Sequence, residues 1–214
     1  MAGDDAFTPG AIESGRKLFA QRCEFMLGVV RLDGLPDEGP TEIAFAGRSN
    51  VGKSSLLNAL TGQKGLARAS NTPGRTREIN FFDLGGALRL VDLPGYGYAR
   101  ASRKESEGWM RLTRDFMRGR APLRRVCVLV DSRHGLKSSD LEIMDMLDES
   151  AVNYQIVLTK IDKIKPSAWG GVVESTAAMI RRRPAAHPHI HATSSEKGDG
   201  LARLRADLAA LAGA

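Results

Sequence analysis

The octapeptide Gly47-Arg48-Ser49-Asn50-Val51-Gly52-Lys53-Ser54 determines how the rest of this sequence is interpreted. It has the pattern of a phosphate-binding loop, in which two glycines enclose four residues and lysine and serine follow. The apolar run 43–46 before it is typical of a buried strand, and leucines recur at helical spacing over residues 56–60 after it. The motif therefore stands between a strand and a helix, as it requires. The alternative is an ordinary glycine-rich turn.

The residue types of this loop suit phosphate chemistry. Glycines allow the backbone to bend tightly, and the turned amides at a helix N-terminus form a cradle of partial positive charge for phosphate. Lys53 is expected to reach the terminal phosphates of a nucleotide as a mobile point charge. The Ser54 hydroxyl is a hard oxygen ligand of the kind that Mg²⁺ prefers.

The composition is that of a globular protein with one main domain. The chain has 214 residues, of which 42% are hydrophobic and 26% charged. The sequence has no apolar run as long as a membrane span, and its acidic start lacks the features of a signal peptide. We expect a cytoplasmic monomer with a flexible tail over residues 1–20, a short helix around 14–19, and a single domain over residues 21–214.

Apolar segments of strand and helix type alternate along the chain, which predicts a doubly wound α/β fold. Its sheet would be mixed but mostly parallel, with helices on both faces. The expected strands lie at 43–46, 79–83, 87–92, 126–130, 156–158 and 190–193, with a strand or arm at 25–32. The expected helices follow the loop and lie at 104–118, 138–147, 167–183 and 201–211.

Three further motifs follow predicted strands, at the edge where α/β proteins bind ligands. In Asp92-Leu93-Pro94-Gly95, the carboxylate is expected to hold Mg²⁺ and the glycine amide to meet a terminal phosphate. In Thr159-Lys160-Ile161-Asp162, the carboxylate suits the two adjacent N–H donors of guanine and would stay unpaired against adenine. Ser194-Ser195-Glu196 is expected to offer an amide to the guanine oxygen. Each motif is weak alone, but the ordered set is specific.

With these motifs, the sequence resembles the EngB family in the Era/EngA/EngB group of GTPases over about residues 25–211. Further matching stretches are Asn71-Thr72-Pro73-Gly74-Arg75-Thr76, Asn80 to Asp83, Tyr96 to Ala99 and Arg133 to Leu136. The resemblance implies the G domain of a P-loop NTPase, and with it a Mg²⁺-dependent GTPase that binds GTP and GDP and assists assembly of the large ribosomal subunit. It also implies a link to septation and cell division, and it makes Thr76 a switch threonine that joins Ser54 on Mg²⁺.

The expected site combines these assignments. The expected metal ligands are Ser54, Thr76 and Asp92, and the expected catalytic residues are Lys53, Asn50 and Thr76. The residues expected to contact the nucleotide are Gly47, Arg48, Ser49, Asn50, Val51, Gly52, Lys53, Ser54, Ser55, Gly74, Arg75, Thr76, Asp92, Leu93, Pro94, Gly95, Thr159, Lys160, Ile161, Asp162, Thr193, Ser194 and Ser195.

Two positions bear on the rate of hydrolysis. Many GTPases orient the attacking water with a glutamine just after Asp-x-x-Gly, where this chain has Tyr96. Since tyrosine has no amide for that task, we expect slow intrinsic hydrolysis. Relatives in the group hold a K⁺ ion partly through an asparagine at the position of Asn50, which makes potassium stimulation a hypothesis. The alternative is that Asn50 only favours a tight turn.

The basic residues gather in one segment. Between Arg100 and Arg125, nine basic and three acidic residues account for the whole net charge of +6. Helical spacing puts Arg111, Arg114 and Arg118 on one face of the predicted helix. We expect this surface to bind ribosomal RNA in the large-subunit precursor. The alternative is an ordinary solvated helix face.

Other readings of the sequence remain open. A P-loop small-molecule kinase would share the phosphate loop but would leave Thr159-Lys160-Ile161-Asp162 unexplained. A GTP-dependent cell-division interaction protein would be expected to form higher oligomers. His187, His189 and His191 alternate as metal ligands on a strand might, but no cysteine or acidic residue lies close in sequence, so we interpret them as structural.

Overall fold

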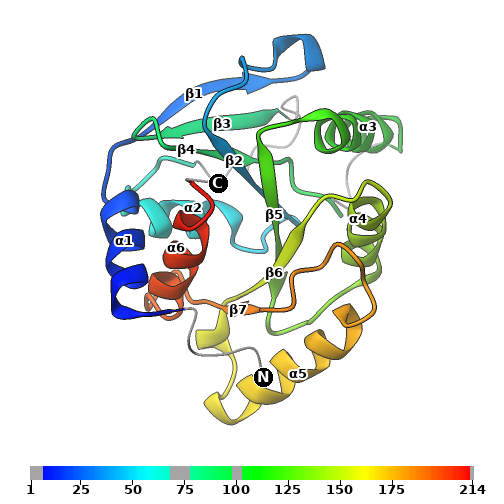
Figure 1. Ribbon diagram of the computed structural model, residues 1–214. Helices are drawn as coiled ribbons and strands as arrows, with labels where there is room; N and C mark the ends of the chain where they lie inside the picture. The colour runs from blue at the N-terminus through cyan, green and yellow to red at the C-terminus, as the bar shows by residue number, and fades with distance from the viewer. Residues whose placement is uncertain (1–6, 68–77, 98–102, 213–214) are drawn as a thin grey trace.

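The computed structural model describes residues 7–67, 78–97 and 103–212, and its centre is a seven-stranded sheet (Figure 1). The strand order is β1-β3-β4-β2-β5-β6-β7. The strands are β1 Cys23–Val29, β2 Thr41–Gly47, β3 Ile79–Leu84, β4 Leu88–Asp92, β5 Leu123–Asp131, β6 Tyr154–Thr159 and β7 His191–Ala192. The helices are α1 Pro9–Phe19, α2 Lys53–Thr61, α3 Arg103–Gly119, α4 Ser138–Glu149, α5 Trp169–Ile180 and α6 Leu201–Ala209, with 3₁₀ turns at Leu32–Gly34, Ile161–Lys163 and Pro166–Ala168.

The sheet is mixed but mostly parallel, which confirms the predicted fold class. β4, β2, β5, β6 and β7 pair in parallel, while β1 with β3 and β3 with β4 pair in antiparallel fashion. Parallel neighbours end at the same edge of the sheet. The segments that follow β2, β4, β5, β6 and β7 therefore all start from one edge, and this edge carries the sequence motifs.

Both faces of the sheet are covered by helices. α1, α2 and α6 pack on one face, and α3, α4 and α5 on the other (Figure 1). Side chains of β2 alternate between the two cores, since Ile43 and Phe45 join the first and Ala44 and Ala46 the second. Burial on both faces explains why the central strands appear in sequence as continuous apolar runs. Among the described residues, no helix combines the length and apolar character needed to cross a bilayer.

The start of the chain differs from the prediction. Residues 9–19, expected to lie in a flexible tail, form helix α1, which packs along α6. Thr8 caps the helix through its hydroxyl, and Phe19 is buried in the core. The short helix expected around 14–19 is thus confirmed as part of α1. The expectation of a flexible tail is wrong for residues 9–19, because a partner helix nearly 200 positions later covers their apolar side. Residues 1–6 lie outside the described part.

Gly15 allows the close approach of α1 to α6. A Cβ atom at this position would lie 2.5 Å from the backbone nitrogen of Ala206. We predict that Gly15→Ala lowers the free energy of unfolding by roughly 1–3 kcal/mol through overpacking, although alanine favours a helix by about 1 kcal/mol. Urea unfolding measures the change. Gly10→Ala is the matched control, because its Cβ would meet only Thr8 Oγ1 at 3.9 Å. Equal effects of the two substitutions would contradict a docked α1.

Candidate nucleotide-binding site

The phosphate-loop sequence lies where the prediction put it, between β2 and α2. Gly52 precedes the first helical residue with φ +106°, a conformation that glycine adopts without strain. Asn50 also has a positive φ, +63°, and asparagine is one of the few other residues that tolerates it. The turn-favouring role of Asn50 is therefore real, whatever further role it has. The loop leads directly into the N-terminus of α2, which favours bound anions.

The charged groups expected at the phosphates and the metal lie together. Lys53 begins α2, Asp92 ends β4, and the ammonium of Lys53 forms an ion pair with Oδ1 of Asp92. Both side chains are 12% exposed. Ser54, next to Lys53, is partly buried. A hydroxyl and a carboxylate are hard oxygen donors, so this donor set fits Mg²⁺.

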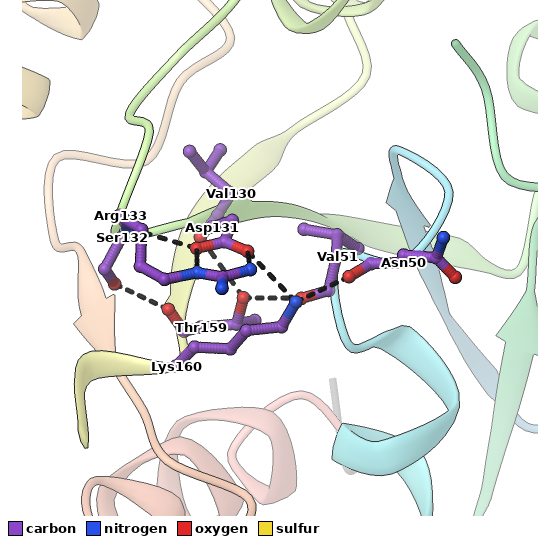
Figure 2. A network of polar contacts seen from close by, with 8 residues as sticks. All are labelled: Asn50, Val51, Val130, Asp131, Ser132, Arg133, Thr159 and Lys160. Carbon is purple, nitrogen blue, oxygen red and sulfur yellow. Dashed lines mark hydrogen bonds and ion pairs between the residues drawn. The ribbon is translucent and has the colours of Figure 1, made fainter. Parts of the chain in front are cut away.

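The motif that begins at the end of β6 is hydrogen-bonded to the phosphate loop (Figure 2). The Thr159 hydroxyl donates a hydrogen bond of 2.7 Å to the carbonyl of Val51. The Lys160 ammonium donates one of 2.6 Å to the carbonyl of Asn50. Both acceptors are backbone groups of the loop, so the two motifs form one hydrogen-bonded unit although they are more than 100 residues apart.

Asp131, the last residue of β5, completes this unit. Its carboxylate accepts hydrogen bonds from Lys160 Nζ at 3.0 Å and from the Arg133 guanidinium at 2.9 and 2.7 Å. Burial raises the pKa of Asp131, but the hydrogen bonds from Arg133 and Lys160 outweigh it and hold the pKa well below its usual range. The carboxylate is thus ionised at neutral pH. The sequence interpretation did not include Asp131 or this use of Arg133.

The Asp162 carboxylate is set up as a hydrogen-bond acceptor. Its side chain is 3% exposed, and Oδ1 accepts a hydrogen bond of 2.6 Å from the Ser194 hydroxyl. This bond lowers the pKa of Asp162 against the effect of burial, and Lys163 adds to it. Oδ2 lies 3.1 Å from Lys163 Nζ but accepts no well-formed hydrogen bond among the described residues. The carboxylate therefore keeps capacity for donors of a ligand.

A cavity of about 560 Å³ lies between α2 and the loops after β6 and β7. This volume is within the usual range of small-molecule sites. The cavity has the end of the phosphate loop at one side and Asp162 at the other, so it can take a base and sugar with phosphates directed at the loop. Its lining residues are Gly52, Ser55, Asn58, Ala59, Gly62, Gln63, Lys64, Thr159, Lys160, Asp162, Lys163, Ser195 and Glu196.

One wall of the cavity depends on Asn58, which the sequence interpretation missed. Its side-chain oxygen accepts a hydrogen bond of 2.8 Å from the Ala67 amide, and its nitrogen donates one of 3.1 Å to the Ala67 carbonyl. This reciprocal pair fixes residues 63–67 beside α2. A polar residue on the helix face next to the loop was the available signal.

Some predicted contact residues also have structural partners within the protein. Ile161 is buried, the Leu93 amide bonds the Phe45 carbonyl, and the Thr193 hydroxyl bonds the Leu158 carbonyl. The Arg48 guanidinium lies 3.3 Å from Asp140 of α4 and does not line the cavity. Gly74, Arg75 and Thr76 lie outside the described residues.

Tyr96 is part of the core. The residue is 3% exposed, and its hydroxyl donates a hydrogen bond of 2.9 Å to Asp140. Burial, followed by the charge of Asp140, raises its pKa well above the ordinary value. Its amide bonds the Gly47 carbonyl at 3.2 Å, and its carbonyl accepts a bond of 3.0 Å from the Ser49 amide. The backbone of Tyr96 is thereby joined to the phosphate loop.

The arginines of the basic segment 100–125 are only partly exposed on the surface. Arg120 donates two hydrogen bonds, of 2.9 and 2.6 Å, to the buried carboxylate of Glu42. Arg125 is also buried and bonds Gln155 at 2.9 Å and Asp207 at 3.2 Å. The predicted basic surface is wrong for these two residues, because a count of charges does not reveal buried pairs. The exposed arginines of this segment in the described part are Arg111, Arg114, Arg118 and Arg124.

The sequence matches the family model described as 50S ribosome-binding GTPase over residues 42–160, more than half of the chain. It is 56% identical to the probable GTP-binding protein EngB of Rhodospirillum rubrum over 98% of this chain and 93% of that protein. The protein of the same name from Caulobacter vibrioides is 57% identical, over 99% of this chain and 92% of the relative.

Solved structures of GTP-binding proteins have a similar fold. The crystal structure of a probable GTP-binding protein EngB superposes with a TM-score of 0.66 at 25% identity, covering 81% of this chain and 99% of that one. Era of Aquifex aeolicus bound to GDP and AlF₄⁻ has a TM-score of 0.60 at 22% identity, over 79% of this chain and 56% of that one, which supports the fold alone. The sequence relatives confirm the resemblance that the motifs indicated. This chain therefore belongs to the EngB family of GTP-binding proteins.

Proposed function

We propose that this chain is a guanine-specific, Mg²⁺-dependent switch with slow intrinsic GTP hydrolysis that assists assembly of the large ribosomal subunit. The observation that carries the guanine assignment is the Asp162 carboxylate, which is buried, ionised and short of hydrogen bonds at the edge of the cavity. Guanine offers it two adjacent N–H donors. Adenine offers no such pair, so the carboxylate would stay unsatisfied. A kinase with a broad nucleotide site has no need of this group.

The guanine site can be tested by calorimetry with GTP, GDP, ATP and XTP. We expect the wild type to bind GTP and GDP but not ATP. Asp162→Asn should weaken GTP binding at least about 100-fold and favour XTP, whose base has an acceptor where guanine has a donor. Glu196→Gln is the control, since Glu196 lines the same cavity and pairs with Lys163 but is 68% exposed. ATP binding as tight as that of GTP would refute the proposal.

The residues expected at the phosphates support the proposal that intrinsic GTP hydrolysis is slow. Lys53 would neutralise the terminal phosphates, and Ser54 and Asp92 would hold Mg²⁺, with Thr76 as the third ligand that the resemblance implies. When bound, the metal supplies further neutralisation of phosphate charge. The Tyr96 hydroxyl donates its hydrogen bond to Asp140, and the tyrosine side chain has no amide that could orient a water molecule. A protein with this arrangement depends on other groups to accelerate the reaction.

A potassium ion is one such group. We infer that K⁺ binds near Asn50 and stimulates hydrolysis. The left-handed backbone of Asn50 supports a compact loop. The residue is exposed, and its side-chain oxygen is a hard ligand of the kind that suits K⁺. The conformation alone does not require the amide, because glycine adopts it equally well.

One substitution separates the side chain of Asn50 from its backbone conformation. Asn50→Gly keeps the backbone conformation and removes only the side chain. We expect wild-type GTP hydrolysis to be several-fold faster in KCl than in NaCl, and Asn50→Gly to hydrolyse GTP at the same rate in both salts. GDP affinity serves as the control for an intact loop. Equal wild-type rates in the two salts would leave Asn50 with its turn-forming role only.

The ribosomal role is supported by the exposed arginines of α3. Arg111, Arg114 and Arg118 are all exposed at helical spacing, and α3 follows the segment after Asp92-Leu93-Pro94-Gly95. Such a row suits RNA phosphates. The link to septation that the resemblance implies needs no separate surface in this proposal, since cell division depends on protein synthesis. A cytoplasmic location is supported by two free, buried cysteines, which fit a reducing compartment.

Ribosome pelleting tests the α3 surface. The double variant Arg111→Glu, Arg114→Glu should lose binding to large subunits about tenfold or more and should reduce its dependence on salt. Arg118 is left unchanged because it also bonds Ser150. The control Arg181→Glu, Arg182→Glu changes the charge equally at exposed positions after α5. Similar binding by both double variants would count against a specific surface on α3.

A further inference from the structure

The lysine of the guanine-side motif is held from two directions (Figure 2). Its ammonium bonds the Asn50 carbonyl at 2.6 Å and Oδ2 of Asp131 at 3.0 Å. The backbone of Lys160 is left-handed, with φ +58°, and that of Asn50 is left-handed too. The first bond therefore joins two uncommon conformations, one in each motif. Both must persist if the cavity is to keep its shape.

The stem of Lys160 also forms part of the cavity wall. A Cβ atom at Gly52 would lie 3.5 Å from Cε of Lys160, so the stem runs alongside the end of the phosphate loop. An ammonium with only a neutral carbonyl as partner would be free to swing toward water. The Asp131 carboxylate supplies the fixed negative charge that keeps it in place, and charge-assisted hydrogen bonds are the strong ones.

We infer that Asp131 is a positioning residue for nucleotide binding, which acts through Lys160 to keep the phosphate loop and the guanine-side motif in one arrangement. The inference rests on the guanine site proposed above. Asp131 lies at the end of β5, between the strands that carry the two motifs, and its side chain is only 6% exposed. Its position is therefore fixed by the sheet and not by the loops that it organises.

Arg133 has the opposite influence in this arrangement. Its guanidinium takes both carboxylate oxygens of Asp131, while its own side chain is 43% exposed. It competes with Lys160 for the same negative charge. Removal of Arg133 leaves Lys160 as the sole side-chain cation on Asp131 in the described structure. Asp131 and Arg133, although paired with each other, should thus have different effects on nucleotide affinity.

Release of fluorescently labelled GDP, measured by stopped flow, separates these effects. Asp131→Asn keeps the shape of the side chain but removes its charge, and we expect release about tenfold faster or more. Arg133→Met should release GDP no faster than the wild type. Asp148→Asn is the matched control, because this carboxylate of α4 is 15% exposed and pairs with Arg183 away from the cavity. It should alter thermal stability and leave GDP release unchanged.

A purely structural role for Asp131 makes different predictions. Asp131→Glu restores the charge but adds a methylene in a buried site, so packing alone would make it at least as damaging as Asn. We expect Glu to release GDP more slowly than Asn does. In a Lys160→Met background, Asp131→Asn should add less than a twofold change. Faster release from Glu than from Asn, or full additivity with Lys160→Met, would overturn the inference.

The same measurements distinguish this inference from the proposed function. If Asp162→Asn weakens GDP binding but Asp131→Asn does not, the guanine site stands and the positioning role of Asp131 fails. If Asp162→Asn leaves GDP and GTP binding unchanged, the guanine assignment itself fails. Thermal unfolding of every variant without nucleotide identifies any substitution that acts only by destabilising the fold.

Discussion

Two hydrogen bonds to carbonyls of the phosphate loop hold the candidate site together. They come from Thr159 and Lys160, at the end of β6, and they reach Val51 and Asn50. This distance in sequence is bridged because β2, β5 and β6 are parallel neighbours whose ends lie at one edge of the sheet. Asp131 at the end of the middle strand then lies beside Lys160. The chemistry of the site is thus a consequence of strand order.

Features that depend on local patterns were predictable from the sequence. The phosphate loop, the alternation of strands and helices and the motif around Asp162 each depend on neighbouring residues, and the fold follows from their order. The docking of helix α1 and its start at Pro9 were not predictable in the same way, because the partner that covers it is α6, at the other end of the chain. Gly15, which weakens a helix in isolation, is required there by close packing.

Charges were harder to interpret than hydrophobic patterns. Arg120 and Arg125 have the same composition signal as the exposed arginines of α3, yet Arg120 pairs with the buried carboxylate of Glu42 and Arg125 with the partly buried one of Asp207. His191, one of three alternating histidines, likewise lies 2.7 Å from Asp207 through Nε2, which gives it a structural partner. A buried carboxylate left without its partner is costly, so Arg120 and Arg125 belong to the core of the protein and not to its surface.

Tyr96 combines two constraints that bear on how such a site would signal. Its backbone is bonded to Gly47 and Ser49 in the phosphate loop, and its hydroxyl to Asp140 at the start of α4. Asp140 also bonds the Lys137 amide and pairs with Arg48 of the loop. A buried tyrosine with these partners cannot leave the core without breaking several of them. The first residue after Asp-x-x-Gly is therefore an anchor in this protein, and it links the phosphate loop to α4.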